Sequence, residues 1–329
     1  MRTAVLATLL FGGIPASLFP QTDAVPGLKP GENSAILFAA KASPSATDQN
    51  GDPIPQQIEP IAFIVRGQLR QCDSSTSEKD SAAAKSAVLT QLQQAYTTGR
   101  RYPLWRGGGQ WGQAEVVKSC IDADVNLLAA CVQLKARAAQ IAPRSSFRGI
   151  AFSGPPPISS HSSAISKAGK PDKNAFIAGV SRIFRDERIN VPKARIAAHE
   201  VWKTQLRPDH RAISGSALAQ IPGRKAGTYR SYRVFAVLEE DNGQYNPVLR
   251  SIHNTTIEFD KTSRAQESGE LEEGEDTDRE EFFDSFPLFP GEPDAVITEH
   301  TYYEGWNFSI YRWKDGLYRR VYTGCGGGL

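Results

Sequence analysis

The chain has 329 residues, of which 40% are hydrophobic and 22% are charged, and its formal net charge is +2. These proportions are typical of a globular protein that buries a core. A charge so close to neutral gives no overall field that would attract nucleic acid or an anionic membrane, so we expect no nucleic-acid partner. The length allows one large domain or two of ordinary size.

The N-terminal residues have the pattern of a secretory signal peptide. Met1 and Arg2 give a positive start, residues 3–19 are almost entirely apolar, and residues 22–24 (Thr-Asp-Ala) offer small side chains for cleavage. The apolar run is too short, and too broken by glycine and proline, to span a membrane. We therefore expect residues 1–24 to be removed and the mature protein to be periplasmic or extracellular, without a membrane span.

Four cysteines, Cys72, Cys120, Cys131 and Cys325, occur in a chain predicted to be exported, where disulfides are more common than metal or redox sites. A hairpin that turns at residues 123–124 would place Cys120 and Cys131 roughly 13 Å apart, at about 3.3 Å per residue, which is too far for a bridge. We therefore expect Cys72 to form a disulfide with Cys120 or with Cys131, and Cys325 to remain a free thiol.

Compositional breaks divide the chain into two domains. Residues 144–171 are rich in Ser and Pro and predict a linker, which separates an N-terminal β-rich domain, residues 25–143, from a C-terminal domain, residues 172–329. Residues 44–60 are rich in Pro, Asp and Gln and predict a loop. Residues 261–284 carry ten acidic side chains and predict a solvated acidic loop, with weak calcium binding as the alternative.

In the N-terminal domain, short strands and one helix are expected. The helix extends from about Lys79 to Gly99, because apolar residues recur there at helical spacing, namely Val88, Leu92, Ala95 and Tyr96. The strands are expected at residues 35–40, 61–69, 102–106 and 113–118.

The C-terminal domain begins with a second helix, and almost everything after it has the pattern of strands. Asp172 is the expected N-cap and Pro192 the expected end of this helix. Its apolar face consists of Phe176, Val180, Ile183 and Phe184. The predicted fold class is therefore α+β, mainly β, with antiparallel sheets of short strands and hairpins and one helix in each half.

An internal repeat organises the C-terminal domain. Residues 211–220 followed by 232–249 parallel residues 294–303 followed by 306–322, each with a strand, a loop and a hairpin. The hairpins turn at Asn242-Gly243 and at Asp315-Gly316, dipeptides that suit two-residue turns with positive φ. At equal offsets from the turn glycine, Phe235, Val237, Tyr245 and Val248 match Phe308, Ile310, Tyr318 and Val321. The two phenylalanines and the aliphatic residues of these sets should share one buried face.

The end of the chain resembles a known group of proteins. The segments that carry the resemblance are Tyr302-Tyr303-Glu304-Gly305-Trp306, Ile310-Tyr311-Arg312, Gly316, Val321-Tyr322 and Gly324 to Gly328. They look like the ending of uncharacterised exported bacterial proteins whose strand–hairpin units are similar to FG-GAP (integrin-like propeller) repeats. The resemblance covers residues 194–329 and implies a scaffold without naming an activity. The calcium loops of such repeats are missing here, and two copies are too few to close a propeller.

Two motifs contain residues typical of a cofactor or metal site but lack other features that such a site requires. Residues 107–112 fit the glycine pattern of a dinucleotide-binding loop, yet no helix opens there, so we interpret them as a hairpin loop and expect no cofactor. His199 and Glu200 begin like a zinc-protease helix, but Lys203 stands where the second histidine is needed. The alternation of residues 196–203 favours a strand, so we expect no metal site.

No catalytic motif emerges from the remaining residues, so we interpret the chain as more consistent with a binding protein than with an enzyme. The strongest binding candidates are aromatic: Tyr302, Tyr303, Trp306, Tyr311, Trp313 and Tyr318. Trp313 faces Tyr318 across the predicted turn, and such a stripe can stack on a glycan or on a partner protein of the envelope. Alternatively, both faces of this sheet are buried as core.

The sequence thus predicts an exported soluble binding or scaffold protein of the bacterial envelope or exterior. The alternative is a secreted hydrolase that acts on an envelope polymer through a histidine and a carboxylate, with His199, Glu200, His253 or His300 in its site. Assembly through an exposed sheet edge is a third possibility. The sequence does not indicate the oligomeric state.

Overall fold

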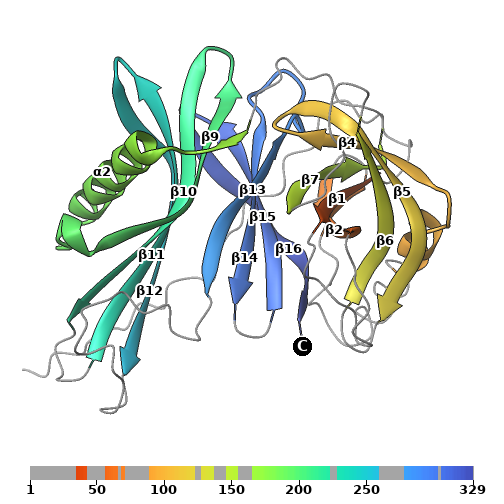
Figure 1. Ribbon diagram of the computed structural model, residues 1–329, viewed down its shortest axis with the longest axis horizontal. Coiled ribbons are helices and arrows are strands. Elements are labelled where there is room, and N and C mark those ends of the chain that lie inside the picture. Colours follow the sequence, from red (N-terminus) through yellow and green to blue (C-terminus); the bar gives the residue numbers. More distant parts are fainter. Residues whose placement is uncertain are drawn as a thin grey trace, which may run out of the picture.

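The computed structural model describes residues 35–42, 56–65, 68–70, 89–122, 127–136, 146–154, 165–222, 228–258, 278–302 and 305–328. Four layers follow one another across the molecule: helix α2, a five-stranded sheet, a four-stranded sheet and a six-stranded barrel (Figure 1). All paired strands are antiparallel, and a helix occurs in each half of the chain. The predicted α+β, mainly β class is confirmed.

The barrel is built from the N-terminal half of the chain. Its strands are β1 (Ala35–Ala42), β2 (Gln56–Val65), β4 (Arg101–Arg106), β5 (Gly109–Asp122), β6 (Leu127–Ala136) and β7 (Phe147–Phe152). They follow the order β1-β7-β4-β5-β6-β2, and pairing of β1 with β2 closes the ring, while the short β3 (Gln68–Arg70) pairs with β2. Closure satisfies the backbone groups that an open sheet would leave at its edges.

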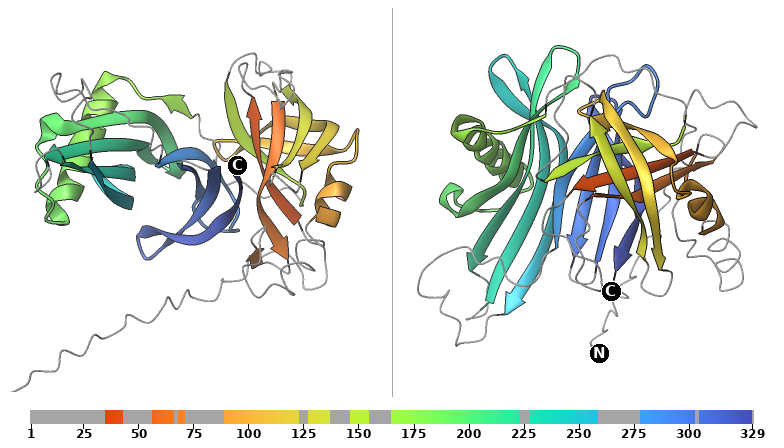
Figure 2. Two further views of the ribbon diagram at one scale, coloured as in Figure 1. Left: turned by 90° about the horizontal axis from the view of Figure 1, so that it is seen from below. Right: turned by 45° about the vertical axis from the view of Figure 1, so that its right-hand side comes forward.

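Strand β1 shows why the barrel lies against the rest of the molecule. Ile36 and Phe38 point into the barrel interior, where Tyr96, the residue after the helical segment 89–95, also packs. The alternate residues Leu37 and Ala39 belong to a second core, shared with the four-stranded sheet. Because both faces are covered, β1 is apolar almost throughout. The helical segment lies on the side of the barrel remote from the four-stranded sheet (Figure 2).

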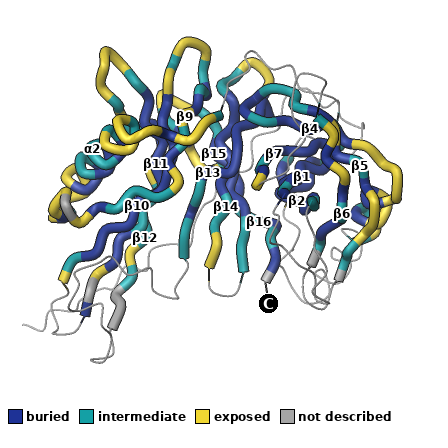
Figure 3. The backbone as a smooth tube through the Cα atoms, in the orientation of Figure 1, coloured by how far each residue is buried: buried dark blue, intermediate teal, exposed yellow. Residues whose placement is uncertain are grey.

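The C-terminal half forms two successive meanders. The first contains β9 (Ile196–Arg207), β10 (His210–Pro222), β11 (Thr228–Asp241) and β12 (Gln244–Glu258), with β8 (Ser166–Lys167) beside β9. The second contains β13 (Arg279–Phe286), β14 (Ala295–Tyr302), β15 (Gly305–Lys314) and β16 (Leu317–Gly328). Their facing sides are buried, whereas several hairpin tips are exposed (Figure 3).

The predicted repeat is present in the backbone of both meanders. Asn242 and Gly243 have φ values of 50° and 75°, and Asp315 and Gly316 have 52° and 81°, as a two-residue turn of this type requires. Both hairpins also contain a bulge five residues after the turn glycine, at Val248 and at Val321. Equal turns and equal bulges make the two hairpins geometrically equivalent.

Helix α2 (Lys170–Asp186) covers the outer face of the five-stranded sheet. Its predicted apolar face is confirmed, because Phe176, Val180, Ile183 and Phe184 are buried. The predicted cap is wrong by three residues: Gly169 is the N-cap, and Asp172 accepts a hydrogen bond from the Gly169 backbone N–H at 3.1 Å. A short 3₁₀ turn, η1 (Lys193–Arg195), follows and leads into β9. Within the described residues, no helix is both long and apolar enough to cross a membrane.

Three segments expected to be irregular contain strands. Strand β7 lies inside the expected linker, β2 begins inside the expected loop 44–60, and β13 takes up the last six residues of the expected acidic loop. In each case the strand is buried against elements distant in the sequence, so local composition does not reveal it. The predicted signal peptide and the rest of these segments lie largely outside the described residues.

The expected disulfide between Cys72 and Cys120 or Cys131 is a wrong prediction. Strands β5 and β6 pair Cys120 with Ala129 and Lys118 with Cys131, two positions away from the register expected for a turn at residues 123–124. This register brings the two Sγ atoms to 3.3 Å, and neither cysteine forms a disulfide. No two cysteines of the described residues lie at bonding distance, and Cys72 is outside them.

Candidate functional site

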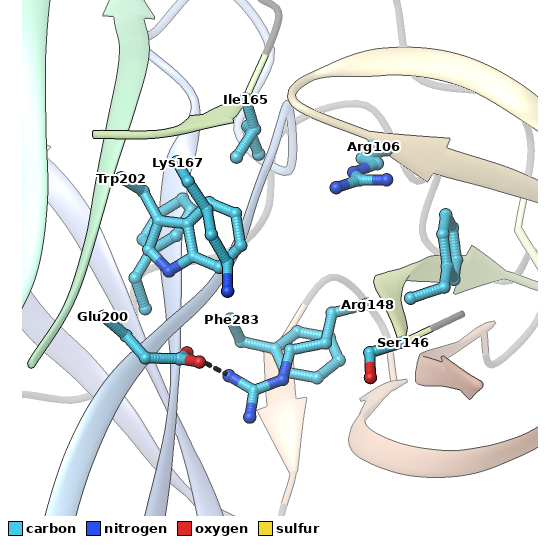
Figure 4. Close-up of a pocket in the computed structure, with 10 residues that line it drawn as sticks. Arg106, Ser146, Arg148, Ile165, Lys167, Glu200, Trp202 and Phe283 are labelled. Carbon is cyan, nitrogen blue, oxygen red and sulfur yellow. Dashed lines mark hydrogen bonds and ion pairs between the residues drawn. The ribbon is translucent and has the colours of Figure 1, made fainter. Parts of the chain in front are cut away.

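A cleft of about 450 Å³ lies where the barrel, the five-stranded sheet and β13 meet (Figure 4). One wall comes from β8 and β9, the opposite wall from the end of β4 and the start of β7, and the floor from β13. Its lining consists of Arg106, Ser146, Phe147, Arg148, Ile165, Lys167, Glu200, Trp202, Phe282 and Phe283. Side chains from five strands therefore converge here.

Pairing between β8 and β9 determines the aromatic wall. Lys167 is opposite Trp202 in the antiparallel register, and the Lys167 Nζ lies 5.6 Å from the centroid of the Trp202 ring. Glu200 is two residues before Trp202 on β9, at a bulge in the pairing with β10, and both side chains line the cleft. This wall combines a flat ring, a cation–π contact and a carboxylate.

Positive charge predominates in the cleft. Arg106, Arg148 and Lys167 line it together with a single carboxylate, that of Glu200. Arg148 Nη1 lies 3.4 Å from Glu200 Oε2, whereas Arg106 lies over the Phe147 ring at 5.2 Å. Among the described residues, neither Arg106 nor Lys167 has a carboxylate within ion-pair distance. Two cations in the cleft are thus available to an anion.

One hydrogen-bond donor of the wall is also unsatisfied. The Nε1 atom of Trp202 is buried and has no acceptor among the described residues. A buried donor without a partner costs about 1–3 kcal/mol.

The floor is held in place by a buried carboxylate. Phe282 and Phe283 line the cleft, and the next residue, Asp284, accepts hydrogen bonds from the backbone N–H groups of Gly107 at 2.9 Å and Ser285 at 2.8 Å. Burial raises the pKa of Asp284 to about 7, and those two hydrogen bonds only partly oppose this. Because Gly107 follows Arg106, this contact also fixes the end of β4 at the cleft.

The glycine segment 107–112 belongs to a hairpin, as the sequence predicted: residues 107–108 form the turn and residues 109–112 begin β5. Arg106 pairs with Gly109, and the two glycines between them have positive φ values of 59° and 73°. A β-carbon on Gly108 would lie 2.1 Å from Asp294 Oδ2, so the loop also needs a glycine for its close approach to the four-stranded sheet. The segment joins two layers and opens no helix.

The structure brings together two of the four residues considered for a hydrolase. The rings of His253 and His300 have centroids 5.2 Å apart, near the ends of the two meanders. His253 Nε2 lies 3.7 Å from Glu280 Oε2, and His300 Nε2 donates a hydrogen bond to Asp278. Glu200 lies in the cleft instead, whereas His199 is not among the residues that line it; both lie on β9, which is a strand as predicted.

Glu280 is an ionised carboxylate inside the protein. Its Oε1 atom accepts hydrogen bonds from Tyr311 at 2.6 Å and Thr298 at 2.8 Å. Burial alone would raise its pKa, but His253 and the surrounding hydroxyl groups outweigh burial and hold the pKa at about 2. The same contact raises the pKa of His253.

This cluster does not have the geometry of a nucleophilic hydrolase. Ser251 Oγ lies 3.1 Å from His253 Nε2, the same ring nitrogen that faces Glu280. A serine–histidine–acid relay places the nucleophile and the acid at different ring nitrogens. Among the described residues there is also no group of three or more His, Cys, Asp and Glu side chains that could hold a metal ion.

The predicted aromatic stripe lies mostly inside the protein. Tyr311 and Tyr318 are buried in the core between the two sheets, and Trp313 is half-buried beneath the Arg207 guanidinium at 4.2 Å. Trp306 is on the other face and donates a hydrogen bond to Glu59 of the barrel at 2.9 Å. Both faces of the four-stranded sheet are therefore covered, which is the alternative that the sequence left open.

The two remaining residues of the predicted aromatic stripe are Tyr302 and Tyr303. Tyr302 is exposed, and Tyr303 lies outside the described residues. Of the cleft residues, only Glu200 was singled out from the sequence, and for a different chemistry. Arg106, Arg148, Lys167 and Trp202 come from separate segments without a shared motif, so no local signal identifies them.

No protein-family model, curated protein or solved structure matches this chain. The similarity of residues 194–329 to FG-GAP units therefore stays a prediction, and function has to be inferred from the cleft itself.

Proposed function

We propose that the protein is an exported binding protein of the bacterial envelope or exterior, and that the cleft binds an acidic saccharide. The observation that carries the proposal is the combination of three cations, Arg106, Arg148 and Lys167, with the Trp202 ring in one cleft of about 450 Å³. Export is inferred from the signal pattern of residues 1–24.

The chemistry of an acidic sugar fits this lining. Its apolar C–H face packs on a flat aromatic ring such as Trp202, which lines the cleft. Its carboxylate pairs with arginine or lysine, and the fork of an arginine can bind both carboxylate oxygens. The volume is within the range of small-ligand sites, about 300–1,000 Å³.

This proposal changes the location of the binding surface but not the class of function. The aromatic stripe of the four-stranded sheet is engaged in packing, so a glycan or protein partner cannot reach most of it. The hydrolase alternative is disfavoured, because His253 and His300 contact carboxylates but do not line the cleft, and Ser251 and Glu280 approach the same nitrogen of His253.

The test is calorimetric titration of the mature protein with a glucuronic-acid disaccharide and with its neutral counterpart that contains glucose. We expect binding of the acidic sugar only. Arg106→Ala and Trp202→Ala should each weaken binding about tenfold or more, because a hydrogen bond to a charged group contributes about 1.5–3 kcal/mol and 1.4 kcal/mol is a factor of ten.

Lys203→Ala is the matched control for Lys167→Ala. Lys203 is adjacent to Trp202 but projects from the other face of β9 and is exposed. Lys167→Ala should weaken binding, and Lys203→Ala should leave it unchanged. Equal affinity for the acidic and the neutral sugar, or no binding of either, would contradict the proposal.

A further inference from the structure

Glu200 reaches across the cleft. It projects from β9 of the five-stranded sheet toward Arg148 of the barrel, and the two side chains meet with Nη1 and Oε2 3.4 Å apart (Figure 4). About a third of each side chain is exposed, 34% for Arg148 and 36% for Glu200. The pair is thus long and solvated, which makes it weak.

Arg148 has a second carboxylate partner that is held much more firmly. Glu281 Oε2 also lies 3.4 Å from Arg148 Nη1, but the Glu281 side chain is only 12% exposed and its Oε1 accepts from Arg279 at 3.1 Å. Glu200 has no other ion-pair partner among the described residues. Of the two carboxylates, Glu200 is therefore the one that can leave Arg148 without stranding a buried charge.

We propose that Glu200 occupies the anion subsite of the cleft in the ligand-free protein, and that the carboxylate of an acidic saccharide displaces it from Arg148. This inference rests on the proposed function and names the residue that regulates it. After the exchange Glu281 still contacts Arg148, the ligand supplies the second carboxylate, and Glu200 returns to water. The exchange needs no rearrangement of the strands, since both residues remain where β7 and β9 place them.

The consequence is that Glu200 lowers the affinity of the cleft for anions. It competes for Arg148 when the cleft is empty, and it repels a bound carboxylate when the cleft is filled. Glu200→Gln removes both effects while it keeps the length of the side chain. We expect the glucuronic-acid disaccharide to bind roughly fivefold tighter, which corresponds to about 1 kcal/mol, the upper range for an exposed ion pair.

The experiment compares calorimetric titrations of the wild-type protein, Glu200→Gln and the control Glu187→Gln. Glu187 forms an exposed ion pair with Arg250 at 3.0 Å, next to the end of α2 and outside the cleft, so its substitution should leave binding unchanged. Glu200→Asp retains the charge but shortens the reach to Arg148, and its affinity should lie between those of the wild type and Glu200→Gln.

A double-mutant cycle identifies Arg148 as the shared partner. Arg148→Gln should bind the acidic disaccharide more weakly, and adding Glu200→Gln to it should then increase affinity by less than fivefold, because only the repulsion of the bound carboxylate is left to remove. Unchanged or weaker binding by Glu200→Gln, in a wild type that binds the sugar, overturns this inference alone. Failure of the wild type to bind any acidic saccharide overturns the proposed function and this inference with it.

Discussion

Lys41 of the barrel and Glu299 of the four-stranded sheet form an ion pair of 2.5 Å, although 258 residues separate them in the chain. Glu59 of β2 contacts the same ammonium group and in turn accepts a hydrogen bond from Trp306. Burial opposes the charge of Lys41, but the two carboxylates outweigh it and raise the pKa of Lys41. This buried cluster joins the barrel to the four-stranded sheet.

Lys41→Met should therefore destabilise the protein strongly. The substitution leaves Glu59 and Glu299 in the interface without a cation, and removal of one partner from a buried ion pair costs about 3–5 kcal/mol. Urea unfolding followed by tryptophan fluorescence measures the change. Lys135→Met is the control, because Lys135 pairs with Glu115 at the barrel surface and its side chain is 45% exposed. If Lys41→Met loses no more stability than Lys135→Met, the buried ion-pair cluster of Lys41 does not stabilise the interface.

Asp284 should make stability depend on pH in the neutral range. Its pKa is about 7 in the folded protein and 3.8 in an unfolded chain, so its contribution to stability is complete only below pH 3.8, decreases as the pH rises, and is lost above about 7. Asp284→Asn keeps the acceptor for the Gly107 N–H but cannot ionise. We expect the stability of the variant relative to the wild type to rise by roughly 1–3 kcal/mol between pH 5 and pH 9.

Denaturant unfolding at a series of pH values tests this prediction. The control is Asp315→Asn, since Asp315 lies in the exposed β15–β16 turn and asparagine also accepts positive φ there. If the wild type and Asp284→Asn keep the same difference in stability from pH 5 to pH 9, the carboxyl group of Asp284 does not titrate as expected.

The Glu280–His253 pair should contribute most between about pH 4.5 and 6.5. The depressed pKa of Glu280 adds stability above 4.5 that is lost as the pH falls through about 2. The raised pKa of His253 adds stability below 6.5 that is lost as the pH rises through its folded value. Glu280→Gln should cost about 2–3 kcal/mol at pH 5.5, because buried donors lose an ionised acceptor.

His253→Gln removes the charge of His253 and leaves Asp284 unchanged, so it isolates the pH dependence of the Glu280–His253 pair. Since the histidine is partly exposed, the loss of stability should stay below about 1 kcal/mol and should be confined to acidic pH. Thermal melting at pH 5.5 and pH 8.5 measures it. An equal decrease in melting temperature at both pH values would mean that His253 contributes by packing and not by its charge.

Gly326 should tolerate no side chain. A β-carbon there would lie 1.8 Å from the backbone oxygen of Trp306, a distance that only backbone movement can relieve. Gly326→Ala should cost about 2–4 kcal/mol, in the range of an overpacked core. Gly169→Ala is the control, since its β-carbon would meet no atom closer than 3.7 Å. Wild-type stability of Gly326→Ala in urea would show that β16 is free to move.

Features with local causes could be predicted from the sequence. The turns at Asn242-Gly243 and Asp315-Gly316 depend on residues that accept positive φ, and the buried face of α2 depends on helical spacing. Both are properties of a few adjacent residues. The repeat was visible for the same reason, because equivalent turns and apolar positions recur at equal offsets.

The register of β5 and β6 could not be predicted in this way. A shift of two residues leaves every side chain on the same face of the sheet, so the hydrophobic pattern is compatible with either register. A bulge at Val117 and a loop longer than two residues determine the actual pairing, and thereby the contact between Cys120 and Cys131.

The acidic run and the cleft were missed because their partners are distant in the sequence. A run of carboxylates usually indicates a solvated loop, yet Glu280 and Asp284 are buried with His253 and Gly107 as partners. In the cleft, Arg148 and Glu200 meet only because the barrel lies beside the first meander. Such contacts depend on the packing of whole layers, which no short segment encodes.

The two meanders are enclosed at both ends of their stack. A repeat array exposes an apolar face at each end unless a terminal cap covers it. Here α2 caps the first meander with Phe176 and Val180, and the barrel caps the second through Leu37 and Ala39. The array is thus complete with two units, so a third strand–hairpin unit inserted in the chain would have to displace one of its caps.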